Sequence, residues 1–171
     1  MRKLRLLLTE DCNRACPGCC NIGFDLKGLP ICEDLTCWDE VYLTGGEPML
    51  NPDSVIVIAD SIPMPTKVIL YTAKVDPLEA AMAVLEALDG MTLTLHDQGD
   101  VEPFLALNEA ILETGWITLS LRLNVFEGVQ LPAGVKLDLW TVRAGRTWVK
   151  DCPIPEGEVF MRLGRGLFTH T

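Results

Sequence analysis

Short β-type runs and helical segments alternate along this chain, and this alternation restricts the fold more than any other feature of the sequence. Apolar runs of strand length recur from Leu4 to Val142, and segments with apolar residues at helical spacing separate several of them. Such an order predicts parallel βαβ units joined by right-handed crossovers. We expect strands over residues 4–9, 41–44, 68–72, 92–95, 117–123 and 135–142.

Two of the expected helices carry start signals. Asn51 followed by Pro52 predicts an N-cap and a first helical turn. Asp76 and Pro77 predict a second start, with Glu79 as the partner in a capping box. With a third helix over 100–114 that ends at Gly115, the residues expected to face the core are Val55, Ile58, Ala59, Ile62, Leu78, Ala81, Met82, Leu85, Leu88, Phe104, Leu107 and Ile111.

The length of the chain limits the architecture. A full eight-stranded barrel needs roughly 250 residues, and this chain has 171. We therefore expect one α/β domain over 1–171, built as a partial, open (βα) barrel of five or six mainly parallel strands, with 125–171 less regular. The segment 126–134 is too short for a helical crossover, so the strand after it is expected to run antiparallel. Residues 159–163 are a candidate for one further strand, and 20–40 predicts an irregular first crossover.

Composition argues against several classes of partner. The formal net charge is −10, which disfavours a phosphate-backbone footprint and hence a nucleic-acid partner. No apolar run approaches the ~18 residues that span a bilayer, and residues 1–9 lack a small-residue cleavage site, so we expect neither a membrane partner nor a signal peptide. Seven cysteines, an odd number in a metal-like spacing, favour a cytoplasmic location over a disulfide framework.

Three cysteines, Cys12, Cys16 and Cys19, follow the first expected strand with the spacing Cys-x3-Cys-x2-Cys. Three thiolates this close together can hold three irons of a 4Fe-4S cube, whose usual ligands are four cysteines. No fourth cysteine precedes them at a ferredoxin-like distance, so one iron would keep an open position. Catalytic metal sites keep such a position, whereas structural sites close it.

A second motif, Gly45-Gly46-Glu47-Pro48, ends the next expected strand. The two glycines allow a ligand to approach the backbone without a side-chain clash. The carboxylate of Glu47 can accept a charge-assisted hydrogen bond from an ammonium group, and Pro48 fixes the turn. If the strands are parallel, both motifs lie at carboxyl ends, where α/β sheets form their sites.

Other polar residues are expected at the same edge or on the strands that lead to it. Thr72 ends the third expected strand, where it suits packing as well as ligand contact. Arg122 can pair with a carboxylate, and Asn124 can bond a ribose hydroxyl. His96 follows the fourth strand and is more often a hydrogen-bonded residue than a base in such a place. Trp38, Trp140 and Trp148 are candidates for lining a pocket, although aromatic residues are more often core.

Residues 8–19 together with residues 43–48 resemble the radical S-adenosylmethionine (radical SAM) superfamily. The resemblance implies that Cys12, Cys16 and Cys19 hold a 4Fe-4S cluster and that the amine and carboxylate of SAM chelate its fourth iron. The strand end at Gly45, Gly46, Glu47 and Pro48 would bind the amine, and Thr72, Arg122 and Asn124 would complete the cofactor site.

The function implied by the resemblance is reductive cleavage of SAM at the cluster. The 5′-deoxyadenosyl radical that results abstracts hydrogen from a substrate, and an electron donor such as a flavodoxin or ferredoxin reduces the cluster. The resemblance also implies the partial barrel, over roughly residues 4–125. Because such a barrel is open on one side, it suits a protein or peptide substrate.

Two alternatives remain open at the level of sequence. The family usually has an aromatic residue before the third cysteine, and here that residue is Gly18; the small activases of glycyl-radical enzymes share this Cys-Pro-Gly-Cys pattern and act on a partner protein. The second alternative is a non-catalytic iron–sulfur or zinc-binding module, in which Cys20 would be the fourth zinc ligand. Cys20, Cys32, Cys37 and Cys152 also number four, enough for a second metal, but buried free thiols are the simpler interpretation.

Overall fold

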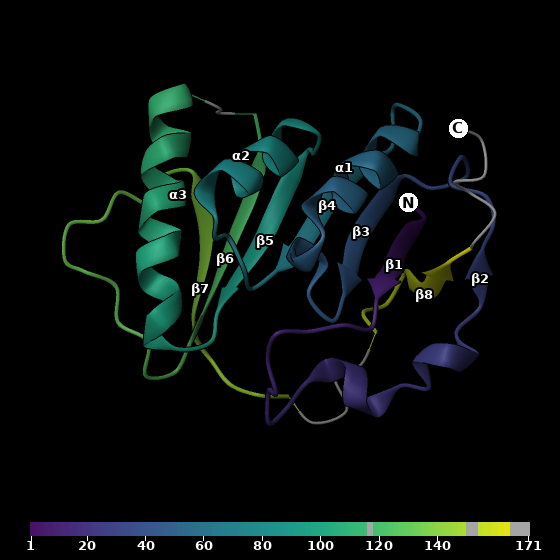
Figure 1. Cartoon of the computed structure of the whole chain (residues 1–171), viewed down its shortest axis with the longest axis horizontal. Helices are drawn as coiled ribbons and strands as arrows, with labels where there is room; N and C mark the ends of the chain where they lie inside the picture. Colours follow the sequence, from purple (N-terminus) through teal and green to yellow (C-terminus); the bar gives the residue numbers. More distant parts are fainter. Residues whose placement is uncertain (116–117, 150–153, 165–171) are drawn as a thin grey trace.

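The computed structural model describes residues 1–115, 118–149 and 154–164. In this part of the chain, one open sheet of eight strands runs in the order β2-β8-β1-β3-β4-β5-β6-β7, and all neighbouring pairs are parallel. Figure 1 shows the three α-helices lying over one face of this sheet. The strands are β1 (Lys3–Thr9), β2 (Ile31–Cys32), β3 (Glu40–Gly45), β4 (Lys67–Thr72), β5 (Gly90–Leu95), β6 (Ser120–Phe126), β7 (Trp140–Arg146) and β8 (Glu158–Leu163), and the helices are α1 (Pro52–Ser61), α2 (Leu78–Glu86) and α3 (Val101–Thr114).

The expected open α/β architecture with parallel strands is confirmed, but the expected count of five or six strands was wrong. The further strand expected over 159–163 is present as β8, between β1 and β2. β2 is only two residues long, so it leaves no periodic signal in the sequence. The first crossover is irregular as expected, because its only helical segments are the 3-10 turns η1 (Cys20–Gly23) and η2 (Leu26–Gly28).

The expectation of an antiparallel strand after 126–134 was also wrong. β7 pairs in parallel with β6, with Leu121 opposite Trp140. The strand begins at Trp140 and not at Val135, so the connection from 127 to 139 has the dozen or so residues that a parallel crossover needs. It makes this crossover without a helix.

The helix signals were partly correct. The side chain of Asn51 accepts a hydrogen bond from the Ser54 amide and caps α1 as predicted, and Gly115 ends α3 in the left-handed region at φ 69°. The predicted cap of α2 was wrong, since Pro77 occupies the N-cap position and the carboxylate of Asp76 pairs with Lys74. α2 ends at Glu86, four residues before the predicted stop at Gly90, which instead begins β5.

The two faces of the sheet differ in chemistry because side chains alternate along each strand. Leucines and valines on one set of positions, such as Leu6, Leu43 and Leu93, are buried against the helices. The opposite set forms what we call the open face, the face without helices; it carries mainly polar and aromatic side chains. The open face includes Lys3, Arg5, Tyr42, Tyr71, Thr92, Thr94, Arg122, Asn124, Arg143, Glu158, Phe160 and Arg162.

The arrows of β1, β3 and β5 point toward the lower part of the view in Figure 1, so their carboxyl ends lie on that side of the sheet. The segment that leaves β1 runs along this edge toward the ends of β4 and β5 and returns through η1 and η2. Within the described residues, no helix combines the length and apolar character that crossing a membrane requires.

Candidate cysteine-loop site

The two sequence motifs meet directly at the carboxyl edge of the sheet. β1 and β3 are neighbours, and their hydrogen bonding continues beyond the strands. The Gly46 amide donates to the Thr9 carbonyl at 2.8 Å, and the Glu47 amide donates to the Asp11 carbonyl at 2.7 Å. We call residues 10–20 the cysteine loop. Because Cys12 directly follows Asp11, these backbone hydrogen bonds join the Gly45–Pro48 motif to the start of that loop.

Close backbone packing explains why two glycines stand in this motif. A Cβ on Gly45 would lie 2.5 Å from the Thr9 carbonyl oxygen, and one on Gly46 would lie 2.0 Å from that of Asp11. The side-chain amide of Asn21 then donates to the Gly45 carbonyl at 2.7 Å. The glycines therefore admit the chain's own backbone, whereas the sequence suggested that they admit a ligand.

Glu47 is almost fully buried, with 3% of its surface exposed. Its Oε1 accepts from the Met49 amide and the Thr72 hydroxyl, and its Oε2 accepts from the Ala73 amide at 2.9 Å. Burial raises the pKa of this carboxyl, and the hydrogen bonds from Thr72, Ala73 and Met49 oppose the rise. The structure therefore brings Glu47 and Thr72 together, and Oε2 keeps acceptor capacity for a second donor.

The three predicted cluster ligands lie in one loop as free thiols. Cys12 is exposed and Cys16 and Cys19 are half-buried, with the Cys19 amide donating to the Cys16 carbonyl at 3.2 Å. Burial raises the pKa of the Cys16 thiol, and Cys19 and Cys12 raise it further.

This donor set has the chemistry that an iron–sulfur cluster requires, namely several thiols on one short loop. Across residues 1–115, 118–149 and 154–164, however, no three His, Cys, Asp or Glu side chains are gathered closely enough to hold a metal ion. Binding a cluster would therefore require the three thiols to draw together.

Arg14, which the sequence did not single out, ties the cysteine loop to the ends of β4 and β5. Its guanidinium donates to both carboxylate oxygens of Asp100, to Asp97 at 3.2 Å and to the Ala73 carbonyl at 3.5 Å. Asp100 is buried and also accepts from the His96 amide at 2.7 Å. The loop is thus anchored at its middle as well as at Asp11.

An aromatic cluster adjoins the same loop. The rings of Trp148 and His96 stack with centroids 5.0 Å apart, and Phe126 packs on Trp148 at 4.5 Å. Gly18 lies so close to Trp148 that a Cβ there would be 2.5 Å from the Cβ of Trp148. Burial lowers the pKa of His96, and Arg14 lowers it further, against the opposing effect of Asp100 and Asp97.

A cavity of about 350 Å³ opens between this aromatic cluster and the cysteine loop. Trp148 therefore lines a cavity, which was one of the two roles expected for the tryptophans. Trp140 has the other role, since it is buried in the core. This cavity is lined by an ion-paired arginine and aspartate, by aromatic rings and by one candidate ligand: the residues are Arg14, Ala15, Cys16, Pro17, His96, Asp97 and Trp148.

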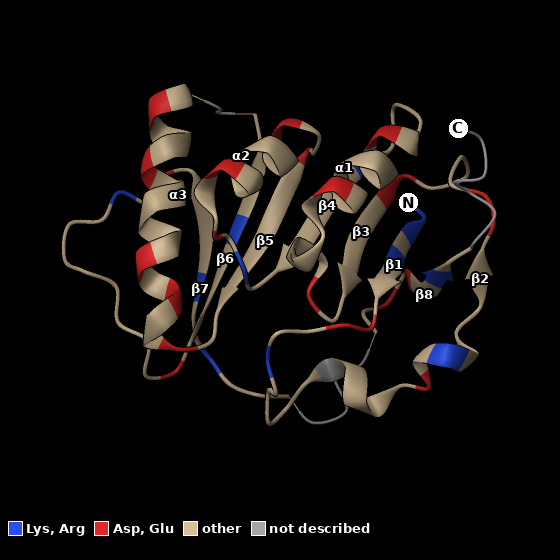
Figure 2. Ribbon diagram, viewed as in Figure 1, with Lys and Arg blue, Asp and Glu red and all other residues tan. Residues whose placement is uncertain are grey.

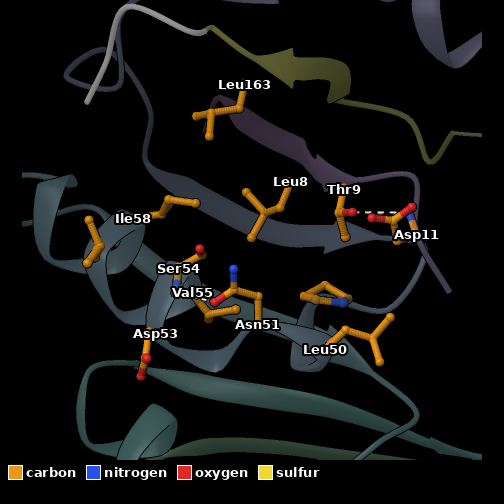
Figure 3. Close-up of a pocket in the computed structure, with 12 residues that line it drawn as sticks. Leu8, Thr9, Asp11, Leu50, Asn51, Asp53, Ser54, Val55, Ile58 and Leu163 are labelled. Carbon is orange, nitrogen blue, oxygen red and sulfur yellow. Dashed lines mark hydrogen bonds between the residues drawn. The ribbon is translucent and has the colours of Figure 1, made fainter. Parts of the chain in front are cut away.

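A larger cavity, of about 770 Å³, lies on the helix side of the motif junction. In Figure 3, aliphatic side chains from α1 and β1 line it, and the Asp11 amide donates to the Thr9 hydroxyl at its margin. Its lining includes Pro48 and Asp11 but none of the three cysteines. The cavity that touches the candidate ligands is therefore the smaller one.

The remaining predicted residues lie on the open face. Asn124 donates to the Thr94 hydroxyl at 3.3 Å, and Arg122 lies opposite Thr92. Neither side chain contacts the cysteine loop through a hydrogen bond within the described residues.

The cysteines proposed for a second metal are only partly described. Cys32 is buried, and its thiol donates to the Asp34 carbonyl at 3.4 Å. Burial raises the pKa of the Cys32 thiol, and the nearby Cys37 raises it as well. Neither Cys32 nor the half-buried Cys37 forms a disulfide within the described residues, and the side chain of Cys20 and residue Cys152 lie outside the described part.

Comparison with protein-family models, curated protein sequences and solved structures returned no match to this chain.

Proposed function

We propose that this chain is a radical SAM enzyme. The observation that carries the proposal is the backbone junction between the motifs, in which the Glu47 amide binds the Asp11 carbonyl at 2.7 Å, one residue before Cys12. Such an enzyme needs its cluster ligands beside the group that receives the amine of SAM. The residue types, their spacing and this junction together support that arrangement.

The architecture proposed for this function is a partial radical-SAM-like barrel. The open parallel sheet, with its helices on one face, supports this assignment. The open face would then line the interior, and the cysteine loop would close its carboxyl end. Placing the reaction between the sheet and the loop would keep water from a reactive radical.

In this proposal, Cys12, Cys16 and Cys19 hold the 4Fe-4S cluster. When bound, the cluster supplies the electron that splits SAM into methionine and a 5′-deoxyadenosyl radical, which takes a hydrogen atom from the substrate. Glu47 accepts a hydrogen bond from the amine of SAM through the free capacity of Oε2. Arg14 would hold the cysteine loop against Asp100 while SAM is bound.

The test uses anaerobically purified and reconstituted protein. We expect about four irons per chain, and 5′-deoxyadenosine by mass spectrometry after dithionite and SAM are added. Cys16→Ala should abolish the product, whereas the matched control Cys37→Ala should retain it. Zinc in place of iron, or product that survives Cys16→Ala, would contradict the proposal, and zinc would favour the non-catalytic binding module.

An activase-like role on a partner protein is a second candidate, favoured by the two edges of the sheet, β2 and β7, which have no further strand beside them among the described residues. An open sheet leaves room for a macromolecule to reach the reacting groups. This role predicts that a partner co-purifies under anaerobic conditions and acquires a glycyl radical, detected by electron paramagnetic resonance, when SAM and reductant are present. Deoxyadenosine formation without any such partner would favour a small substrate.

A further inference from the structure

Charge is divided between the two faces of the sheet. The three α-helices carry acidic residues and no lysine or arginine, and Figure 2 shows red bands on the helices and blue segments on the strands. The open face, in contrast, carries Lys3, Arg5, Arg122, Arg143 and Arg162. The acidic residues of the helices are Asp53, Asp60, Glu79, Glu86, Glu102, Glu109 and Glu113.

The carboxylates of the open face are already neutralised. Glu40 pairs with Lys3 at 3.2 Å, and Glu158 pairs with Arg5 at 2.9 Å. Within the described residues, Arg122 has neither an ion pair nor a side-chain hydrogen bond, although it is half-buried. A cation that is partly withdrawn from water and lacks a partner indicates a place for an anion.

An unpartnered hydroxyl lies beside this arginine. Thr92 lies opposite Arg122 on β6 and opposite Tyr71 on β4, so the three form one row across three neighbouring strands. Thr92 is 8% exposed, and its Oγ1 is buried without a hydrogen-bond partner in the described part of the chain. A buried hydroxyl without a partner destabilises the fold, and a hydrogen bond to a ligand oxygen would remove that cost.

We propose that the row formed by Tyr71, Thr92 and Arg122 binds an oxyanion, a carboxylate or a phosphate, carried by the substrate. The guanidinium of Arg122 supplies paired N–H donors that match either group, and the Thr92 hydroxyl supplies one more donor. The substrate role rests on the proposed function, but anion binding at the row does not depend on it.

The position of the row favours the substrate over the carboxylate of SAM. Glu47, the expected partner of the SAM amine, is held at the end of β4 by Thr72 and Ala73. Arg122 belongs to β6, two strands away, which corresponds to about 10 Å between backbones at the usual strand spacing. An arginine side chain spans part of this separation, so the effect of Arg122→Gln on SAM binding is the measurement that distinguishes the two assignments.

The test measures anion binding by the full chain without metal or SAM, using calorimetry with inorganic phosphate and, separately, with succinate. Arg122→Gln should weaken binding by roughly 10-fold or more, the effect of losing a charged hydrogen-bond partner. Lys136→Gln is the matched control, since it removes one positive charge from an exposed loop residue. Phosphate and succinate titrations distinguish the two kinds of oxyanion.

Thr92→Val provides the second variant. It keeps the shape of the side chain and removes a hydroxyl that has no partner, so the free energy of unfolding should stay the same or rise while anion affinity falls. A loss of stability with unchanged affinity would assign Thr92 a structural role and contradict the proposal.

Three outcomes would overturn the inference. These are no binding of either anion, equal affinities for Arg122→Gln and Lys136→Gln, and an Arg122→Gln variant that loses SAM binding but keeps anion binding. The last would assign Arg122 to the SAM carboxylate. Deoxyadenosine formation is measured independently. Anion binding without deoxyadenosine would reject only the radical chemistry, and deoxyadenosine without anion binding would reject only the anion row.

Discussion

The two tyrosines of the chain, Tyr42 and Tyr71, both lie on the open face. Burial raises the pKa of each phenol; Glu40 raises that of Tyr42 further, and Glu158 that of Tyr71. We therefore expect the folded protein to show little tyrosinate absorbance at 295 nm at pH values near 10, the usual tyrosine pKa.

Stability should change in the same pH range. Above a pH of about 10 the unfolded chain loses its tyrosine protons first, so the folded chain binds more protons and the free energy of unfolding falls as pH rises. Tyr71→Phe should leave a single transition, from Tyr42. Half-complete ionisation of the folded protein at a pH near 10 would contradict the expectation.

Gly46 offers a test of the motif junction. Gly46→Ala would place a Cβ 2.0 Å from the Asp11 carbonyl oxygen, which is backbone and cannot move aside cheaply. We expect a loss of roughly 1–3 kcal/mol in the free energy of unfolding, measured with urea. Gly99→Ala is the control, because its Cβ would first meet the end of the Asp97 side chain at 3.0 Å. Equal losses in both variants would argue against a tight junction.

Sequence reasoning at the scale of residues found the polar types but not their partners. It selected Glu47 for its charge, yet the donors that hold it, Thr72 and the Ala73 amide, depend on the neighbouring strand. Arg14 was missed because its partner Asp100 lies 86 positions away and no local pattern links them. The missing hydrogen-bond partner of the Thr92 hydroxyl also leaves no sign in the sequence, since the sequence does not distinguish a threonine with a partner from one without.

At the scale of elements, the cysteine loop depends on the Arg14 anchor. Arg14→Gln removes the charge and the paired contacts with Asp100, so the loop should open more often. We expect faster hydrogen exchange over residues 10–20 and a loss of roughly 1–3 kcal/mol in stability. The control Arg146→Gln changes an exposed arginine of β7 and should leave loop exchange unaltered. Unchanged exchange in Arg14→Gln would show that the contacts near Asp11 hold the loop alone.

The edge strand β7 is held to α3 by a buried polar pair. The Trp140 indole donates to Asn108 Oδ1 at 2.8 Å, and the Asn108 amide donates to the Lys136 carbonyl at 3.1 Å. Trp140→Phe would leave a buried acceptor unpaired and should cost roughly 1–3 kcal/mol by urea unfolding. Trp38→Phe, which loses a more exposed bond to Asp34, should cost less. The reverse order would contradict this role of the pair.

Elements were predictable where the signal was local. The Asn51 cap and the left-handed Gly115 follow from side-chain chemistry and backbone freedom. Gly90 was predicted to end a helix, but it begins β5. The reason for glycine here is distant in sequence, because a Cβ at this position would lie 2.2 Å from the Ser120 carbonyl oxygen. β2 was missed because two residues carry no period.

At the scale of the whole molecule, the division of charge should affect stability. The net charge is −10, and the charged side chains of the three α-helices are all acidic. Raising NaCl from about 20 to about 300 mM shortens the screening length and weakens this repulsion. We expect the melting temperature, followed by circular dichroism, to rise. A fall would mean that attractive pairs such as Arg5–Glu158 outweigh the repulsion.

The overall architecture was predictable because alternating strands and helices leave few ways to build a sheet. The order of strands was not, because β8 joins β1 across more than 150 positions, as in the Arg5–Glu158 contact with a separation of 153. Which strand pairs with which depends on all the strand edges that are available for pairing, and no local sequence pattern records that choice. The candidate site was predictable to the extent that its two motifs lie on β1 and β3, which are neighbours in space.

The place of β8 also has a consequence for how the chain is made. In the part of the chain that the structure describes, β8 is the one strand that pairs with β2, and it also covers the outer edge of β1. A ribosome releases residues 158–163 long after residues 3–32, so the nascent chain exposes that edge until β8 emerges. The loop between β1 and β2, with its three thiols, would therefore reach its final position only after β8 has paired with both strands.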